Sequence, residues 1–213
     1  NLQNIPIKTE EGKRIRKAFK PAQTDNVLVA ADYSQIELRI LAHMSKDPVL
    51  TESFRNNEDI HRRTASEVFG VAMEDVTKEM RRNAKAVNFG IIYGQTEFGL
   101  SKELGIGRKE AKDYIESYFA RYSGVKQWID TTIQEARSSG ISTTMMGRRR
   151  YIKDINSKNF NLRSFAERTA VNTPIQGTAA DIIKIRLPAL HLSVAPVLVS
   201  VSTARSLGGE DGA

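Results

Sequence analysis

Four side chains at intervals of four residues could bind a phosphorylated ligand. Arg81, Lys85, Phe89 and Tyr93 lie in a segment that reads RRNAKAVNFGIIYG. Each step of four residues drifts by about 40° around a helix, so the four side chains form one slowly rotating stripe. Two cations would face phosphates and two aromatic rings would face a sugar and a base, which suits a nucleoside triphosphate. The alternative is an ordinary amphipathic helix with a solvated basic end.

A carboxylate at the end of an apolar run could bind a metal ion. Asp32 ends the run VLVAAD, which reads as a buried strand, and the segment DYSQIE continues from it into a helix. A strand end holds a side chain rigidly and leaves it open to substrate. Mg²⁺ prefers oxygen ligands and usually takes one or two protein carboxylates with phosphate oxygens. The alternative is that Asp32 only caps the helix that begins near Gln35 or Ile36.

Two amides near a predicted helix break could touch nucleic acid. Asn172 and Gln176 flank Pro174 within the segment RTAVNTPIQGTAAD. Amides can donate to minor-groove acceptors that all base pairs share, so they sense duplex shape rather than sequence. The alternative is ordinary capping at Pro174 and Gly177.

These residues need a largely helical scaffold with a few strands, which is an α+β pattern. Apolar spacing predicts a strand over 27–32, a β-rich segment over 141–144 that turns at Gly147, and a helix C-cap at Gly140. Pro174 and Gly177 are expected to separate the last two helices, and Pro188 to end the second of them. The segment 100–111 resembles a helix-turn-helix, a pattern that is common in helical proteins. The predicted helices cover 36–44, 59–69, 77–93, 108–121, 125–138, 161–171 and 177–186.

Composition narrows the class of protein. The chain has 213 residues and a net charge of 32 − 25 = +7, which favours a polyanionic partner over a neutral one, although a generic basic protein would look the same. No apolar run approaches the roughly 20 residues that cross a bilayer, and no signal peptide opens the chain, so we expect no membrane partner and a cytoplasmic location. The absence of cysteine excludes a disulfide scaffold and a thiolate-ligated zinc site. The first residue is Asn rather than Met, from which we expect a fragment of a longer chain.

The three motifs, in this order, resemble those of family A DNA polymerases, the bacterial DNA polymerase I group. The motifs are DYSQIE, RRxxKxxNFGxIYG and NxPxQGTAAD, and the segments LQNIP, GKRIRKAF and DIHRRTASEVF add to the resemblance over residues 1 to about 185. The resemblance implies an incomplete palm, with a few-stranded antiparallel sheet plus helices, and a mostly helical fingers subdomain. It implies palm over 1–58, fingers over 59–138 and palm again over 139–186.

The same resemblance implies roles for single residues. Asp32 and the backbone carbonyl of Tyr33 would bind Mg²⁺, two ions being used in the intact enzyme, and Asp32 and Lys85 would be catalytic. Glu37 would be the steric gate that excludes ribonucleotides, Phe89 would pack on the sugar, and Tyr93 would stack at the templating position. The residues implied to contact the dNTP are Gln35, Glu37, His61, Arg81, Lys85, Phe89 and Tyr93, and those implied to contact primer–template DNA are Asn4, Arg168, Asn172 and Gln176. The implied reaction is template-directed nucleotidyl transfer by a monomer, in which one ion activates the primer 3′-hydroxyl and the other stabilises pyrophosphate.

The last segment departs from the family pattern. Only Arg205, Glu210 and Asp211 are charged within 187–213, and His191 is followed by Leu192, so the family's later His-Asp-Glu motif is absent. We expect 187–213 to be a poorly ordered tail, read either as a flexible addition or as an out-of-frame translation. One Asp cannot hold two ions, so we expect the isolated chain to be inactive. A non-catalytic nucleic-acid-binding remnant of a polymerase is the alternative function.

Overall fold

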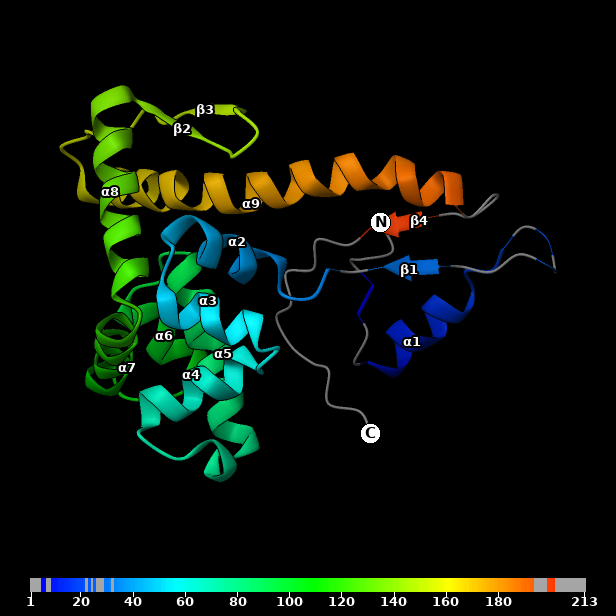
Figure 1. Ribbon diagram of the computed structural model, residues 1–213, viewed down its shortest axis with the longest axis horizontal. Coiled ribbons are helices and arrows are strands. Elements are labelled where there is room, and N and C mark those ends of the chain that lie inside the picture. Colours follow the sequence, from blue (N-terminus) through cyan, green and yellow to red (C-terminus); the bar gives the residue numbers. More distant parts are fainter. Residues whose placement is uncertain are drawn as a thin grey trace. The chain divides into compact units, whose positions relative to one another are not determined.

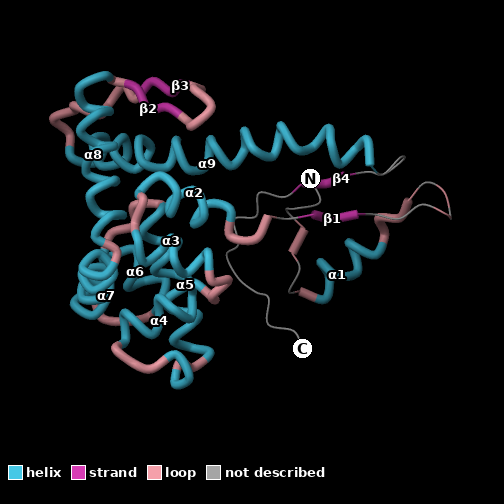
Figure 2. The backbone as a smooth tube through the Cα atoms, viewed as in Figure 1, coloured by secondary structure: helices cyan, strands magenta, loops and turns pink. Residues whose placement is uncertain are grey.

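The α+β prediction is confirmed: the chain is mostly helical, with two small sheets (Figures 1 and 2). A computed structural model describes residues 5–6, 9–21, 23, 25, 29–31, 33–193 and 199–201. The described helices and strands are α1 (Glu10–Lys17), β1 (Val29–Ala31), α2 (Ile36–Ser45), α3 (Pro48–Arg55), α4 (Ile60–Phe69), a 3₁₀ turn (Met73–Asp75), α5 (Lys78–Ile92), α6 (Glu97–Leu104), α7 (Arg108–Arg121), α8 (Ser123–Ser139), β2 (Ile141–Thr143), β3 (Arg149–Tyr151), α9 (Phe160–Ser193) and β4 (Val199–Val201).

The chain divides into two compact units. One is Gln35–Thr178, and the other combines Asn1–Ser34 with Ala179–Ala213. The first unit contains helices α2 to α8, the hairpin of β2 and β3, and the first part of α9. The second unit contains α1, β1, β4 and the rest of α9. The predicted boundaries at residues 58, 138 and 186 remain a prediction.

Side-chain caps explain where the predicted helices begin. Asp59 accepts hydrogen bonds from the first turn of α4, and Thr77 does the same for α5. Gly140 ends α8 with a φ of 71°, as predicted, because glycine reaches that conformation without a Cβ clash. Helices α1, α3 and α6 were not predicted, because eight residues make only about two turns and leave little periodicity.

The helix-turn-helix pattern corresponds to a real pair of helices. Helix α6 ends at Gly105 with a φ of 69°, and α7 starts three residues later at Arg108. Leu100 and Ala111 are buried in this pair, and Arg108 bonds to Glu97 across it at 2.6 Å. The pattern therefore reflects packing within the helical unit.

The predicted break at Pro174 and Gly177 is wrong, since α9 continues without interruption from Phe160 to Ser193. A proline inside a helix has no N–H for the carbonyl four residues earlier, here Ala170. Ser142 on β2 supplies the missing donor: its hydroxyl bonds to the Ala170 carbonyl at 2.7 Å. The strand thus stabilises the helix at the residue where local sequence would end it.

The hairpin of β2 and β3 also packs closely against the helix at Gly177. A Cβ on Gly177 would lie 2.4 Å from Cγ2 of Thr144, so only glycine fits there without movement. Arg148 donates to the Gly177 carbonyl at 2.8 Å, and the Met145 N–H donates to the Thr178 hydroxyl at 3.0 Å. The antiparallel hairpin therefore lies along the first half of α9 (Figure 1).

Replacement of Ser142 by alanine should test this explanation. We expect Ser142→Ala to lower the free energy of unfolding by about 1–2 kcal/mol, because the buried Ala170 carbonyl loses its partner. In a Pro174→Ala background the restored N–H bonds to that carbonyl, so the same change should cost less than about 0.5 kcal/mol. Urea unfolding followed by circular dichroism measures both values, with the exposed Ser138→Ala as control. Equal costs in the two backgrounds would contradict the explanation.

Two further expectations concern the end of the chain. Pro188 does not end α9, which continues five residues past it, because a proline removes only one N–H from the helix. Strand β4 pairs in parallel with β1, with Val29 opposite Val199, so among the strands that the structure describes antiparallel pairing is confined to the hairpin. The predicted poorly ordered tail falls mostly on residues 194–198 and 202–213, which lie outside the described residues.

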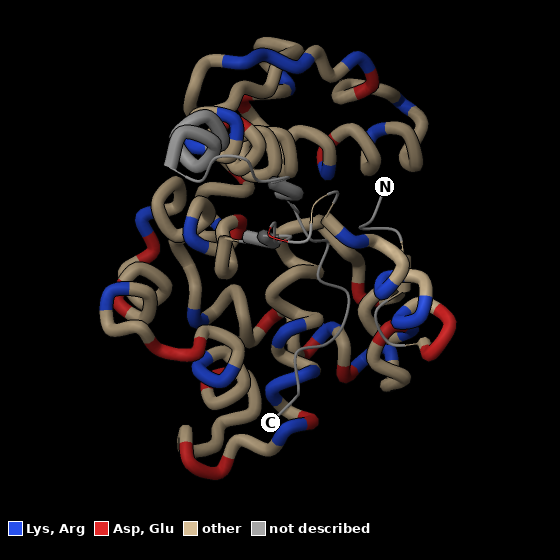
Figure 3. Tube along the Cα trace, turned by 90° about the vertical axis from the view of Figure 1, so that its right-hand side faces the viewer, with Lys and Arg blue, Asp and Glu red and all other residues tan. Residues whose placement is uncertain are grey.

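Charge is spread over the described residues rather than gathered in one band. Lys and Arg alternate with Asp and Glu along the trace (Figure 3). Many are paired on the surface, as in the Lys126–Asp130 pair of α8. Within the described part of the chain, no helix combines the length and the apolar character that a bilayer crossing requires.

Candidate functional site

The predicted stripe lies on one helix, as the spacing required. Arg81, Lys85 and Phe89 belong to α5, and Tyr93 follows the last residue of that helix directly. The rings of Phe89 and Tyr93 stack with centroids 6.3 Å apart and planes inclined by 17°. Both aromatic side chains are half-buried, and the two cations lie nearer the N-terminal end of α5.

Helices α2 and α4 bring two more predicted residues to this stripe. The Tyr93 hydroxyl donates to the Glu37 carboxylate of α2 at 2.8 Å. The His61 ring of α4 lies 5.8 Å from the Phe89 ring, measured between centroids. Six of the seven residues implied to contact a nucleotide therefore lie on α5 or beside it, and α2, α4 and α5 with its C-cap residue supply them.

The two cations of the stripe differ in their surroundings. Nε of Arg81 donates to Asp59 at 2.7 Å, and both side chains are about one-third exposed, so the pair orients Arg81 more than it stabilises the fold. Burial would raise the pKa of the Asp59 carboxyl, but hydrogen bonds from Arg81 and from the Arg62 backbone outweigh it and hold that pKa below its usual value. Lys85 forms no ion pair with any residue that the structure describes. Of the two cations of the stripe, Lys85 is therefore the one whose charge no described carboxylate engages.

Burial determines the charge of His61. The side chain is only 3% exposed, and desolvation, with the charges of Arg81 and Lys85, lowers its pKa to about 4 although Asp59 acts in the opposite direction. The imidazole is therefore neutral at physiological pH.

This pKa predicts a dependence of stability on pH. Because the folded pKa of His61 lies below its ordinary value of 6.5, the unfolded chain binds more protons than the folded chain between about pH 6.5 and pH 4, and stability declines as pH falls through this range. At pH 5 the loss relative to pH 7.5 should be about 2 kcal/mol. Urea unfolding at pH 7.5 and pH 5 measures this loss of unfolding free energy in the wild type and in His61→Gln. The loss in His61→Gln should be smaller than that of the wild type by about 2 kcal/mol. Parallel pH profiles for the two proteins would contradict the assignment.

Three of the four residues implied to contact DNA share one face of α9. Arg168, Asn172 and Gln176 are spaced by four residues inside a continuous helix, so the expected break beside the two amides is absent there. The Arg168 side chain contacts Gly94, where an added Cβ would lie 2.6 Å from its Cγ. The Asn172 Oδ1 is buried and has no partner among the described residues, whereas Gln176 is exposed.

The remaining predicted site residues are Asn4, Asp32, Tyr33 and Gln35. Asp32 and Asn4 lie outside the described residues, and Tyr33 is exposed in the other compact unit. Helix α2 takes Gln35 as its N-cap with a φ of 53° and no side-chain bond, so the helix starts too late for position 32 to be its N-cap. Among the described residues, no group of three or more acidic or histidine side chains could hold a metal ion.

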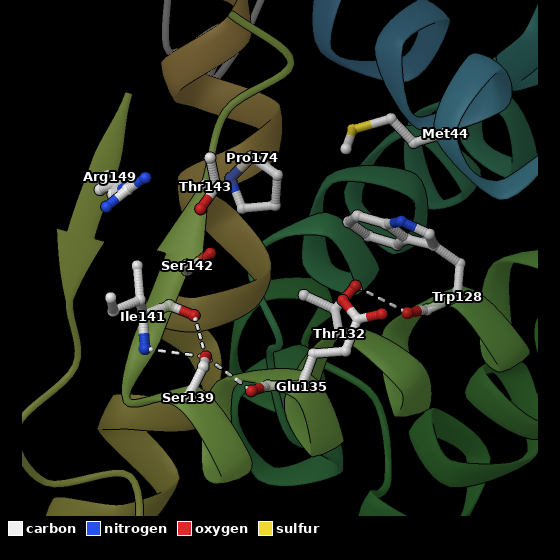
Figure 4. Close-up of a pocket in the computed structure, with 10 residues that line it drawn as sticks. All are labelled: Met44, Trp128, Thr132, Glu135, Ser139, Ile141, Ser142, Thr143, Arg149 and Pro174. Atoms are coloured by element: carbon white, nitrogen blue, oxygen red, sulfur yellow. Dashed lines mark hydrogen bonds between the residues drawn. The ribbon is translucent and has the colours of Figure 1, made fainter. Parts of the chain in front are cut away.

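A separate cavity of about 340 Å³ lies between α8, the hairpin and α9, lined by Met44, Trp128 and Pro174 among others (Figure 4). Three of its hydroxyl groups already donate to backbone carbonyls: Thr132 to Trp128 at 2.8 Å, Ser139 to Glu135 at 2.8 Å and Ser142 to Ala170 at 2.7 Å. This cavity contains none of the predicted site residues.

Sequence reasoning missed two side chains around His61. Asp59 caps α4 and holds Arg81, and Asn88 contacts the His61 ring from inside α5. A signal for Asp59 was its position just before a predicted helix. Asn88 stands within the RRNAKAVNFGIIYG segment but off the stripe, so its spacing indicated no contact.

Comparison with known proteins gives one consistent result. The family model described as DNA polymerase family A matches residues 1–198. DNA polymerase I of Geobacillus stearothermophilus is 61% identical over 184 residues, which are 86% of this chain and 21% of that protein. DNA polymerase I of Bacillus subtilis is 60% identical over the same share of each chain. The chain thus spans about a fifth of the length of these curated relatives.

A solved structure is also similar. It is the POL domain of Pol1 from M. smegmatis in complex with DNA primer-template and dNTP, 44% identical, with a TM-score of 0.82. The match covers 91% of this chain and 34% of that one.

Proposed function

The chain belongs to DNA polymerase family A, and on that premise we propose that it forms the nucleotide-binding part of a template-directed DNA polymerase. Its fold is an incomplete palm with helical fingers. The observation that carries the proposal is the stripe of α5, where Arg81, Lys85 and Phe89 lie beside His61. Cations, a neutral imidazole and stacked rings suit the phosphates, sugar and base of a dNTP.

Each residue of the stripe has a proposed task. Lys85, unpaired with the described residues, would neutralise charge that develops on the triphosphate during transfer. Arg81 keeps N–H groups beyond the Nε that Asp59 engages, and these would bind a phosphate oxygen. Glu37, held by the Tyr93 hydroxyl, would crowd a ribose 2′-hydroxyl and so act as the steric gate.

In this proposal, α9 is the helix that contacts the DNA. Arg168, Asn172 and Gln176 would contact the minor groove of primer and template, where shared acceptors report duplex shape. In Asn172 the donor to those acceptors would be Nδ2, since Oδ1 accepts hydrogen bonds and is buried without a partner among the described residues. Primer–template DNA and dNTPs are thus the proposed partners of a monomeric, cytoplasmic enzyme.

In this proposal, the divalent metal ions bind only to the complete polymerase. The described residues do not form a metal cluster, and this chain offers Asp32 and the Tyr33 carbonyl to a site for two Mg²⁺ ions. When bound, those ions would activate the primer hydroxyl and stabilise pyrophosphate. Since the sequence contains only Asp32 of the expected carboxylate pair, we expect no primer extension from the 213-residue chain alone.

A chimaera tests the proposed function. Residues 1–185 of this chain would replace the matching segment of the Geobacillus stearothermophilus polymerase, to which the chain is 61% identical. We expect primer extension that requires Mg²⁺, template and all four dNTPs. A folded chimaera that binds primer–template DNA but does not extend it would favour the alternative, a non-catalytic nucleic-acid-binding remnant.

A further inference from the structure

A buried chain of hydrogen bonds ends at the His61 ring. The Tyr122 hydroxyl lies 3.3 Å from the Thr64 hydroxyl, which lies 3.2 Å from Oδ1 of Asn88. Nδ2 of Asn88 lies 3.1 Å from Nδ1 of His61. Asn88, Thr64 and Tyr122 are 0% exposed, so water cannot replace any of these bonds.

The protons of this chain can be assigned in one direction. If Tyr122 donates to Thr64, Thr64 donates to Asn88, and Asn88 donates to Nδ1 of His61, then every proton has an acceptor. Nδ2 of Asn88 also lies 3.1 Å from the Thr64 hydroxyl, so its second proton has an acceptor as well. The structure places Nδ2, not Oδ1, of the Asn88 amide against Nδ1 of His61, which is the orientation that this assignment requires.

The direction of the chain determines which nitrogen of His61 carries the proton. Because Nδ1 accepts from Asn88, a neutral ring must be protonated at Nε2. The charged groups around the ring are Asp59 at the N-cap of α4 and Arg81 and Lys85 on α5. A third cation beside the latter two would repel them, whereas a neutral N–H donor does not.

We propose that Asn88 is a positioning residue that holds His61 as a neutral Nε2–H donor. The ring then offers one N–H to a ligand on the stripe, and its charge does not vary at physiological pH. That the ligand is a triphosphate rests on the proposed function, whereas the tautomer does not depend on it.

Nitrogen NMR of the 213-residue chain tests the tautomer directly. With ¹⁵N-labelled histidine, and with His61→Gln to assign the signals, wild-type His61 should show a protonated Nε2, an unprotonated Nδ1 and no titration down to about pH 5. In Asn88→Asp the new carboxylate would accept from Nδ1, so Nδ1 should become protonated and the titration midpoint should rise above the ordinary value of about 6.5. The tautomer is the readout that a merely structural role of Asn88 would not change.

Two uncharged variants complete the design. Asn88→Leu is similar in size and removes the donor, so both tautomers should appear, and this variant decides the question if the Asn88→Asp chain does not fold. Asn83→Leu removes an amide of the same helix that has no hydrogen bond with the described residues, and His61 should be unchanged in it. A wild-type ring protonated at Nδ1, or the same tautomer in wild type and Asn88→Leu, would overturn the proposal.

Calorimetry with dATP separates this inference from the proposed function. Asn88→Leu should weaken dATP binding at pH 7 by about tenfold, and Asn83→Leu should leave it unchanged. If wild type binds no dATP while NMR shows the Nε2–H tautomer, the proposed function fails and the inference about Asn88 stands. If dATP binds equally well to wild type and Asn88→Leu, the positioning role is overturned.

Discussion

Asp32→Ala in the chimaera is expected to lower the rate of primer extension by about 10³-fold or more, the largest effect of any single change considered. The reason is electrostatic: a carboxylate that binds catalytic Mg²⁺ supplies several kcal/mol of charge stabilisation in the transition state, and each 1.4 kcal/mol is a factor of ten in rate. Quenched-flow measurement of single-nucleotide incorporation gives the rate, and fluorescence anisotropy gives the affinity for primer–template DNA.

The affinity for DNA separates a catalytic role of Asp32 from a structural one. Removal of a metal ligand should leave that affinity within about twofold, because phosphate contacts dominate duplex binding. Asp130→Ala is the matched control, since it removes an exposed carboxylate of α8 whose partner is Lys126. Extension by the Asp32→Ala chimaera within tenfold of the parent would contradict the metal-ligand assignment.

Lys85→Ala should give the second-largest effect, a loss of about 10²-fold in kcat/KM for dNTP in the chimaera. A preorganised donor aimed at developing charge is typically worth a factor of 10²–10³. In the isolated chain the same change should weaken dATP binding about tenfold or more, since a charge-assisted contact contributes about 1.5–3 kcal/mol.

A neighbouring arginine supplies the control for that experiment. Arg82 lies on the same helix off the stripe, is 74% exposed and pairs with Glu79 at 3.5 Å. Arg82→Ala removes one positive charge from α5, as Lys85→Ala does, but should change kcat/KM less than about twofold. Similar losses in the two variants would mean that general positive charge, rather than the position of Lys85, attracts the nucleotide.

The prediction of the candidate site from sequence succeeded where contacts are local. The interval of four residues placed Arg81, Lys85 and Phe89 on one face of α5, because helical geometry alone decides which residues share a face. It could not indicate that Arg81 is held by Asp59, 22 residues earlier, while Lys85 has no ion pair among the described residues. That difference arises from the packing of α4 against α5.

The three motifs alone identify the family, and residues such as Asp59 and Gly140, whose side chain or φ acts within one turn, predict where many helices begin or end. The continuity of α9 and the tautomer of His61 depend instead on packing between distant segments. In both cases the hydrogen-bond partner comes from far along the chain: Ser142 reaches Ala170 over 28 residues, and Asn88 reaches His61 over 27. A buried polar group must be satisfied, and only packing determines which distant residue satisfies it.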